Sequence, residues 1–177
     1  MLTRIDKFQW HVTDVYSYPA ETAPCRTSRG GALMSVFCSE LSKELTFLVV
    51  DDSHSMRRII TRTLRDMPVG DVLEAEDAFQ AMDIMQFKRV DFILCDWNMP
   101  GKKGIDFLRE LRGMEQFKEV PFLMVSAESR AADIVEAIRC GVSNYLPKPF
   151  TPDILKRKIE AILRMRNISC IPDANDE

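Results

Sequence analysis

The chain has 177 residues, of which 46% are hydrophobic and 29% charged, and its net charge is −3. This size and composition predict one globular domain with some additional chain, large enough to form a core without disulfides or a structural metal. The slightly acidic balance argues against a protein that coats nucleic acid. No apolar run approaches the roughly 18–20 residues of a membrane span. We therefore expect neither a nucleic-acid partner nor a membrane span.

The five cysteines are scattered along the chain and form no Cys-x-x-Cys pair. An odd number without such spacing predicts neither a disulfide framework nor a zinc site. The first ten residues also lack the apolar core of a signal peptide. These features favour a reducing compartment, and we expect a cytoplasmic protein.

The sequence divides into three segments. Residues 1–43 have no sustained period and include a stretch rich in Pro, Thr, Ser and Gly, which is typical of a disordered N-terminal extension. Residues 44–166 are regularly patterned and predict the folded domain. Residues 167–177 are polar and acidic, as expected for a short tail.

Within the domain, apolar runs alternate with helical patterns. Short apolar runs predict strands at 45–50, 72–75, 92–95, 121–125 and 144–146. Apolar residues at helical spacing predict helices over 56–67, 78–85, 105–111, 134–138 and 154–163. Such alternation predicts an α/β fold with a doubly wound parallel sheet and helices on both faces.

Chemically reactive side chains follow the predicted strands. Asp51 and Asp52 end the first strand, Asp96 the third and Ser126 the fourth, and Lys148 follows the fifth. In an open parallel sheet, ligands bind at the carboxyl ends of the strands. Two carboxylates about 4 Å apart repel by roughly 4 kcal/mol at an effective dielectric of 20, so a cluster of three is expected to hold a cation. Oxygen ligands beside a lysine suit Mg²⁺ and formation of an aspartyl phosphate.

Each of these residues also has a purely structural interpretation. Asp51 and Asp52 could cap the following helix, and Ser126 could cap the next turn. Tyr145 could be an ordinary half-buried strand residue. Trp97 is expected to be partly exposed at the rim of the sheet.

Four segments together resemble the receiver domains of two-component response regulators, and among these the CheY-like chemotaxis regulators. The segments are Val49-Val50-Asp51-Asp52-Ser53, Cys95-Asp96-Trp97-Asn98-Met99-Pro100, Val125-Ser126-Ala127-Glu128 and Tyr145-Leu146-Pro147-Lys148-Pro149-Phe150. The resemblance covers about residues 44–165. It implies a flavodoxin-like, five-stranded sheet of order 2-1-3-4-5 with five helices.

The resemblance also implies roles for individual residues. Asp96 would be the phosphoacceptor, and Ser126 and Lys148 would contact the phosphoryl group. Mg²⁺ would bind Asp52, Asp96 and the main-chain carbonyl of Asn98 directly, and Asp51 through water. Ser126 and Tyr145 would form the switch, and the partner surface would include Ile134, Ile138, Tyr145 and Lys158. The Lys148–Pro149 peptide bond is expected to be cis.

By this resemblance the chain is a single-domain phosphoacceptor rather than an enzyme. A sensor histidine kinase would phosphorylate it, and a phosphatase is a possible further partner. With no output domain expected, the phosphorylated form would act by binding another protein, such as the flagellar motor switch. The alternatives are a phosphorelay shuttle, a haloacid-dehalogenase-like phosphatase and a scaffold that is not phosphorylated.

Two features depart from the family pattern. Ser126 stands where the CheY-like regulators have Thr, which keeps the hydroxyl but loses the branched carbon that restricts its rotamer. Lys102 and Lys103 place a basic pair close to Asp96, where an acidic residue is common. The phosphoryl lifetime and the docking of the kinase are the properties that these changes would affect.

Overall fold

The computed structural model describes residues 45–128 and 130–168, with side chains up to residue 165. The expected extension over 1–43 lies outside the described residues, as does all but the start of the expected tail. Asn167 and Ile168 belong to the last helix rather than to that tail. The proposed division into three segments therefore stays a prediction.

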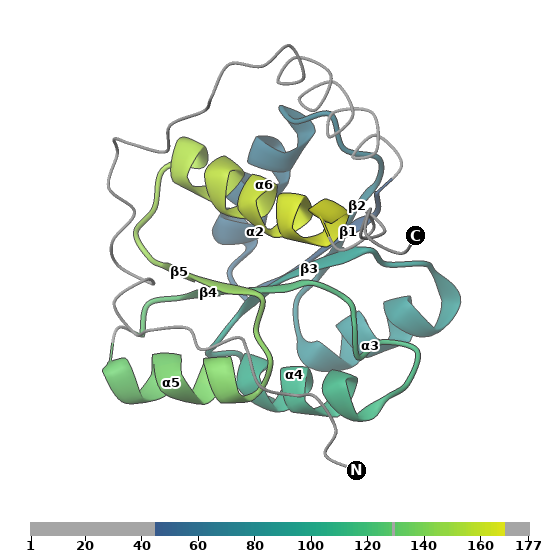
Figure 1. Ribbon diagram of the computed structural model, residues 1–177, viewed down its shortest axis with the longest axis vertical. Helices are drawn as coiled ribbons and strands as arrows, with labels where there is room; N and C mark the ends of the chain where they lie inside the picture. Colours follow the sequence, from purple (N-terminus) through teal and green to yellow (C-terminus); the bar gives the residue numbers. More distant parts are fainter. Residues whose placement is uncertain (1–44, 129, 169–177) are drawn as a thin grey trace, which may run out of the picture.

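A parallel sheet of five strands forms the centre of the domain (Figure 1). The spatial order is β2-β1-β3-β4-β5, as expected. The strands are β1 (Phe47–Val50), β2 (Val72–Ala75), β3 (Phe92–Asp96), β4 (Phe122–Ser126) and β5 (Asn144–Pro147). All neighbouring pairs are parallel, so the carboxyl ends of all five strands lie along one edge.

Helices cover both faces of the sheet. They are α2 (His54–Arg65), α3 (Ala78–Phe87), α4 (Gly104–Gly113), α5 (Ala131–Arg139) and α6 (Pro152–Ile168). Helices α2 and α6 lie on one face, and α3, α4 and α5 lie on the other (Figure 1). In the described part of the chain, no helix is both long enough and apolar enough to cross a membrane.

The core consists of two apolar clusters, one on each side of the sheet. Alternating residues of the central strands belong to different clusters. Leu48 and Ile93 face α3 and α4, whereas Val49 and Leu94 face α2 and α6. The residues of β1, β3 and β4 are buried because helices cover both of their sides. This explains why these strands are continuous apolar runs in the sequence.

Two local features differ from the sequence-based expectation. Helix α2 begins at His54, before the apolar spacing starts, because the Ser53 hydroxyl caps it by accepting a bond from Met56 N at 3.4 Å. The expected exposure of Trp97 is wrong. Its side chain is 4% exposed and packs into the core on the α3, α4 and α5 side of the sheet.

Candidate functional site

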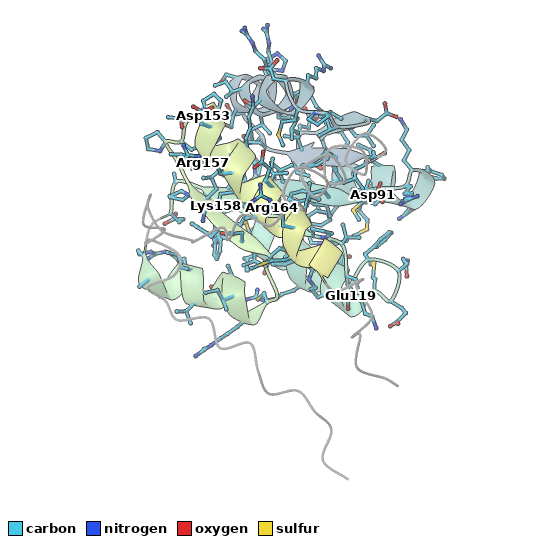
Figure 2. The ribbon with its side chains drawn as sticks, turned by 45° about the horizontal axis from the view of Figure 1, so that its top comes forward. Asp91, Glu119, Asp153, Arg157, Lys158 and Arg164 are labelled. Atoms are coloured by element: carbon cyan, nitrogen blue, oxygen red, sulfur yellow. The ribbon has the colours of Figure 1, made fainter. Side chains whose placement is uncertain are left out.

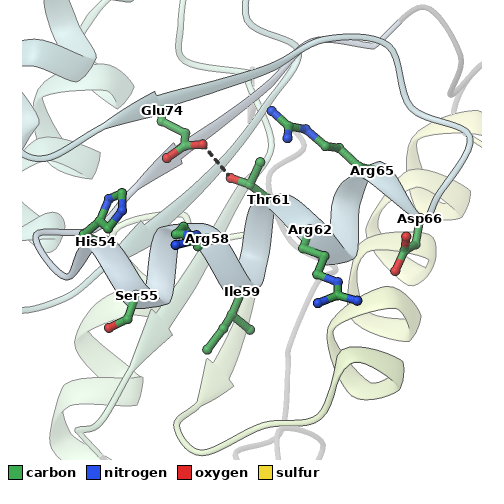
Figure 3. Close-up of a pocket in the computed structure, with 9 residues that line it drawn as sticks. All are labelled: His54, Ser55, Arg58, Ile59, Thr61, Arg62, Arg65, Asp66 and Glu74. Atoms are coloured by element: carbon green, nitrogen blue, oxygen red, sulfur yellow. Dashed lines mark hydrogen bonds between the residues drawn. The ribbon is translucent and has the colours of Figure 1, made fainter.

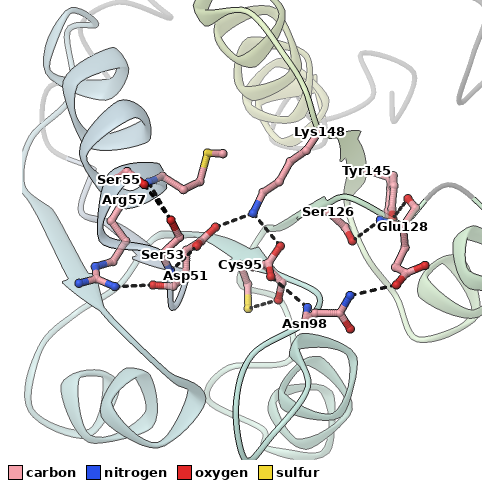
Figure 4. Close-up of polar contacts among 12 residues, drawn as sticks. Asp51, Ser53, Ser55, Arg57, Cys95, Asn98, Ser126, Glu128, Tyr145 and Lys148 are labelled. Carbon is pink, nitrogen blue, oxygen red and sulfur yellow. Dashed lines mark hydrogen bonds and ion pairs between the residues drawn. The ribbon is translucent and has the colours of Figure 1, made fainter.

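Three strand ends bring Asp51, Asp96 and Lys148 into direct contact (Figure 4). Lys148 Nζ lies 2.7 Å from Asp51 Oδ2 and 2.8 Å from Asp96 Oδ1. Lys148 can reach them because β5 ends beside β4, and its main-chain N–H bonds Ser126 O at 2.7 Å. The Lys148–Pro149 peptide bond is cis, as expected. One ammonium group therefore bridges two carboxylates that are 45 residues apart in the sequence.

Burial dominates the electrostatics of this contact. Asp51 is 1% and Asp96 7% exposed. Burial raises the pKa of Asp96 above its usual value, although the hydrogen bond from Lys148 opposes this rise. Burial would lower the pKa of Lys148, but its bonds to Asp51 and Asp96 outweigh that effect and raise it. The Lys148 ammonium therefore stays charged, but its single positive charge balances only one of the two carboxylates.

Asp52 is exposed at the same edge of the sheet. Within residues 45–128 and 130–165 its carboxylate has no hydrogen bond, and no three His, Cys, Asp or Glu side chains are grouped closely enough to hold a metal. The donor chemistry nevertheless fits Mg²⁺, because the ligands offered are carboxylate and carbonyl oxygens. Three carboxylates against one ammonium leave an excess of negative charge that a divalent cation would balance.

The loop between β3 and α4 orients Asp96. Asp96 Oδ2 accepts a bond from Asn98 N at 3.0 Å, and Gly104 N donates to Trp97 O at 2.9 Å. A Cβ atom at Gly104 would lie only 2.0 Å from the main-chain oxygen of Asp96. Only glycine allows this approach without movement of the backbone, so Gly104 positions the predicted phosphoacceptor.

The predicted switch residues meet at Glu128. Ser126 is fully buried, and its Oγ accepts a bond from Glu128 N at 3.0 Å. Tyr145 is 2% exposed, and its hydroxyl donates to Glu128 O at 2.6 Å. The Glu128 carboxylate in turn accepts from Asn98 Nδ2 at 3.0 Å (Figure 4). Glu128 thus connects the two predicted switch residues to the loop that follows the predicted phosphoacceptor.

The expected partner surface needs two corrections, and one of them is Tyr145, which is 2% exposed and therefore buried. Ile134 is 1% exposed, because its position on α5 faces the sheet, so its side chain belongs to the core. Ile138 is half-buried on the same helix. Lys158 lies along α6 (Figure 2), and its Nζ donates to Asn144 Oδ1 at 2.9 Å. Burial lowers the pKa of Lys158.

Sequence reasoning assigned no role to three residues that contact the site. Gly104 and Glu128 are two of them, and the third is Arg57, whose Nη1 donates to Asp51 O at 2.6 Å. Glu128 lies in one of the four segments that resemble receiver domains, and Arg57 follows the first of them by four residues. Their proximity to these segments could have drawn attention to them. Their contacts depend on packing between helices and loops that is not visible in one sequence.

The basic pair near Asp96 is partly neutralised. Lys102 pairs with Glu110 on α4, and its Nζ lies 5.7 Å from the centre of the Phe79 ring. The Lys102 side chain is therefore held against α3 and α4. Lys103 precedes α4 and lines a polar pocket of about 330 Å³ together with Asn98 and Glu128.

Comparison with known proteins identifies the family of this chain. Residues 47–160 match the response regulator receiver domain family. The chain is 45% identical to the chemotaxis protein CheY of Pseudomonas aeruginosa over 123 residues, which cover 70% of this chain and 99% of that protein. It is 42% identical to CheY-3 of Vibrio cholerae over 122 residues, covering 69% and 94% of the two chains.

Solved structures show the same fold. The structure of CheY4 of Vibrio cholerae superposes with a TM-score of 0.63 at 33% identity, covering 67% of this chain and 98% of the other. A receiver domain from Francisella gives a TM-score of 0.63 at 27% identity. The phosphatase alternative is not supported, because receiver domains accept a phosphoryl group rather than turn over a substrate. The chain therefore belongs to the response regulator receiver domain family, and it is a CheY-like phosphoacceptor of a two-component system.

Proposed function

We propose that Asp96 is the phosphoacceptor, and that a histidine kinase is the donor. The observation that carries this proposal is the position of Lys148 Nζ between Asp51 and Asp96, 2.7 and 2.8 Å away. A lysine held there by a buried carboxylate can offset the charge on an incoming phosphoryl group. Burial raises the pKa of Asp96, so nearby cations are needed to stabilise its ionised form.

In this reaction a carboxylate oxygen of Asp96 forms a bond to phosphorus while the bond from phosphorus to the donor's imidazole nitrogen breaks. The electron pair of that bond leaves with the imidazole. Asn98 N, which donates to Asp96 Oδ2, keeps the carboxylate oriented during the attack. Mg²⁺ bound by Asp52, Asp96 and the main-chain carbonyl of Asn98, with Asp51 acting through water, would neutralise charge on the phosphoryl oxygens.

The signal would leave the site through Ser126 and Tyr145. A phosphoryl oxygen is a charged acceptor, and a bond from the Ser126 hydroxyl to it would be stronger than a bond to a neutral group. Movement of Ser126 would loosen the β4–α5 loop that holds the Tyr145 hydroxyl at Glu128 O. The surface around Tyr145, Ile138 and Lys158 would then change shape.

The flagellar motor switch is our proposed downstream partner, because the similar proteins of Pseudomonas aeruginosa and Vibrio cholerae are named chemotaxis proteins. A phosphatase could shorten the signal. Binding of the purified motor switch protein should increase when the chain is treated with beryllofluoride. Transfer of the phosphoryl group to a histidine phosphotransfer protein, without such binding, would instead indicate a phosphorelay shuttle.

Phosphorylation with acetyl phosphate and Mg²⁺, followed by mass spectrometry, tests the phosphoacceptor. Asp96→Asn should abolish the modification, because the amide is a poor nucleophile. The matched control is Asp83→Asn, which removes an exposed carboxylate of α3. Phosphate uptake at wild-type level in Asp96→Asn would exclude this assignment.

A further inference from the structure

Arg57 occupies a position that the helix itself does not favour. It lies in the first turns of α2, where no acidic residue is present. A cation near the N-terminus of a helix interacts unfavourably with the helix dipole. Even so, the Arg57 side chain is only 12% exposed. Contacts outside the helix must therefore hold it in place.

Those contacts run to the loop after β1, as Figure 4 shows for Asp51, and to Glu74 of strand β2, whose bond to Thr61 is drawn in Figure 3. Arg57 Nη1 donates to Asp51 O at 2.6 Å and to Asp52 O at 3.2 Å. Arg57 Nε lies 3.7 Å from Glu74 Oε2, and Glu74 Oε1 accepts a bond from Thr61 Oγ1 at 3.2 Å. The guanidinium thus joins the loop to an anchored carboxylate of the sheet.

The two carbonyl groups that Arg57 holds lie on either side of the Asp52 Cα atom. Fixing both peptide groups fixes the backbone angles of Asp52 and hence the direction in which its side chain leaves the chain. Asp51 has side-chain restraints of its own, because Ser53 N donates to its Oδ1 at 2.9 Å and Lys148 pairs with its other oxygen. The Asp52 carboxylate has no hydrogen bond within residues 45–128 and 130–165, so its direction depends on the backbone.

We propose that Arg57 is a positioning residue for Mg²⁺: it holds the peptide groups around Asp52 so that the Asp52 carboxylate is directed to the ion before the ion binds. This inference rests on the metal site in the proposed function and deepens it. Without Arg57, the loop would have to be ordered when the ion binds, and that entropic cost would weaken binding. Glu74 supports the arrangement by keeping the guanidinium at the sheet.

The test is a titration with MgCl₂, followed through the emission of Trp97, in a Trp10→Phe background. The Mg²⁺-dependent shift of the melting temperature gives a second measure of affinity. We expect Arg57→Met, which keeps the length and apolar packing of the stem, to raise the Mg²⁺ Kd about tenfold. Arg57→Lys should recover part of this loss, because an ammonium can bind one of the two carbonyls.

The matched control is Arg58→Met, because Arg58 is the exposed neighbour on the same helix and does not contact the loop. A merely structural role predicts that Arg57→Met lowers the melting temperature without Mg²⁺ but leaves the Kd equal to that of Arg58→Met. That result would overturn the proposal. Should Arg57→Met fail to fold, Glu74→Gln decides, since it removes the ion pair alone: a raised Kd supports the proposal and an unchanged Kd overturns it.

The experiment separates this inference from the proposed function. Wild-type protein that binds Mg²⁺, and loses binding in Asp52→Asn, establishes the metal site independently of Arg57. With that site established, an unchanged Kd in Arg57→Met refutes the positioning role alone. If wild-type protein does not bind Mg²⁺, the metal site and the role of Arg57 both fail.

Discussion

The two halves of the site are held together by different kinds of bond. At the ends of β1 and β3, the Lys148 ammonium bridges the carboxylates of Asp51 and Asp96. On β4 and β5, neutral hydrogen bonds join the hydroxyls of Ser126 and Tyr145 to the main chain of Glu128. The first half therefore consists of buried charges, and the second of neutral contacts between two strand residues and the loop that follows β4.

This difference separates two tasks. Charge-assisted bonds are roughly twice as strong as neutral ones, so the half with Asp96 is arranged before any ligand arrives. Neutral bonds contribute only about 0.5–1.5 kcal/mol each, so the half with Ser126 can exchange them when a charged acceptor appears. On the proposed roles, the half with Asp96, which we call the acceptor half, is rigid, and the half with Ser126, the switch half, can exchange its bonds at small cost.

Lys148→Met should have the largest effect on stability. It leaves the buried Asp51 carboxylate without its ammonium partner, and breaking a buried pair costs about 3–5 kcal/mol. Urea unfolding would measure the loss, with Lys118→Met as the control because Lys118 forms an exposed pair with Glu115. A loss as small as that of the control would show that the acceptor half does not depend on the buried pair.

Gly104→Ala tests the rigidity of the acceptor half from the backbone side. The new methyl group would collide with the main-chain oxygen of Asp96, so the loop must move, at a cost of about 1–3 kcal/mol. Phosphorylation by acetyl phosphate should also slow, since Asp96 is displaced. Calorimetric melting and the phosphorylation rate check the two effects. Gly113→Ala is the control, because nothing beyond its chain neighbours and its own helix backbone lies within 4 Å of the added group.

Ser126→Ala should break the link between the two halves. The variant should still accept phosphate but lose most of its phosphorylation-dependent gain in partner affinity, which for allosteric coupling is typically about 1–3 kcal/mol. Ser126→Thr should keep or strengthen the gain, because the branched side chain restricts the hydroxyl. Partner binding with and without beryllofluoride measures the coupling. A full gain in Ser126→Ala would exclude this hydroxyl as the relay.

Tyr145→Phe should have the smallest effect. It removes the bond to Glu128 O and lowers stability by about 1 kcal/mol, as expected for a neutral hydrogen bond. Phosphorylation should be unaffected, because the ring belongs to the switch half. Denaturant unfolding and the phosphorylation rate check both expectations. A lower phosphorylation rate would show that the Tyr145 hydroxyl also affects the half of the site that contains Asp96.

The order of elements and the candidate site could be predicted from one sequence for a physical reason. In a parallel sheet, strands buried on both faces must be apolar throughout, so β1, β3 and β4 are visible as short apolar runs. Residues that end such strands must meet at one edge. Asp96, Ser126 and Lys148 were therefore identifiable before their contacts were known.

Exposure and contacts between elements could not be predicted in this way. Trp97 was expected at the rim and Ile134 at the surface, but both are buried. Each lies beside a polar or charged residue in the sequence, and whether its side chain turns inward depends on the packing of α4 or α5 against the sheet. A local pattern contains no information about that packing.

The sequence by itself determined the α/β alternation, the strand ends that carry Asp51, Asp52, Asp96, Ser126 and Lys148, and the resemblance to receiver domains. Only the tertiary structure decided which of these groups touch. It placed Lys148 between two buried carboxylates, joined Ser126 and Tyr145 through Glu128, and brought Arg57 to the carbonyl groups around Asp52. The reason is that these contacts join residues from different elements, and their distances depend on how the strands and helices pack rather than on any local spacing of residues.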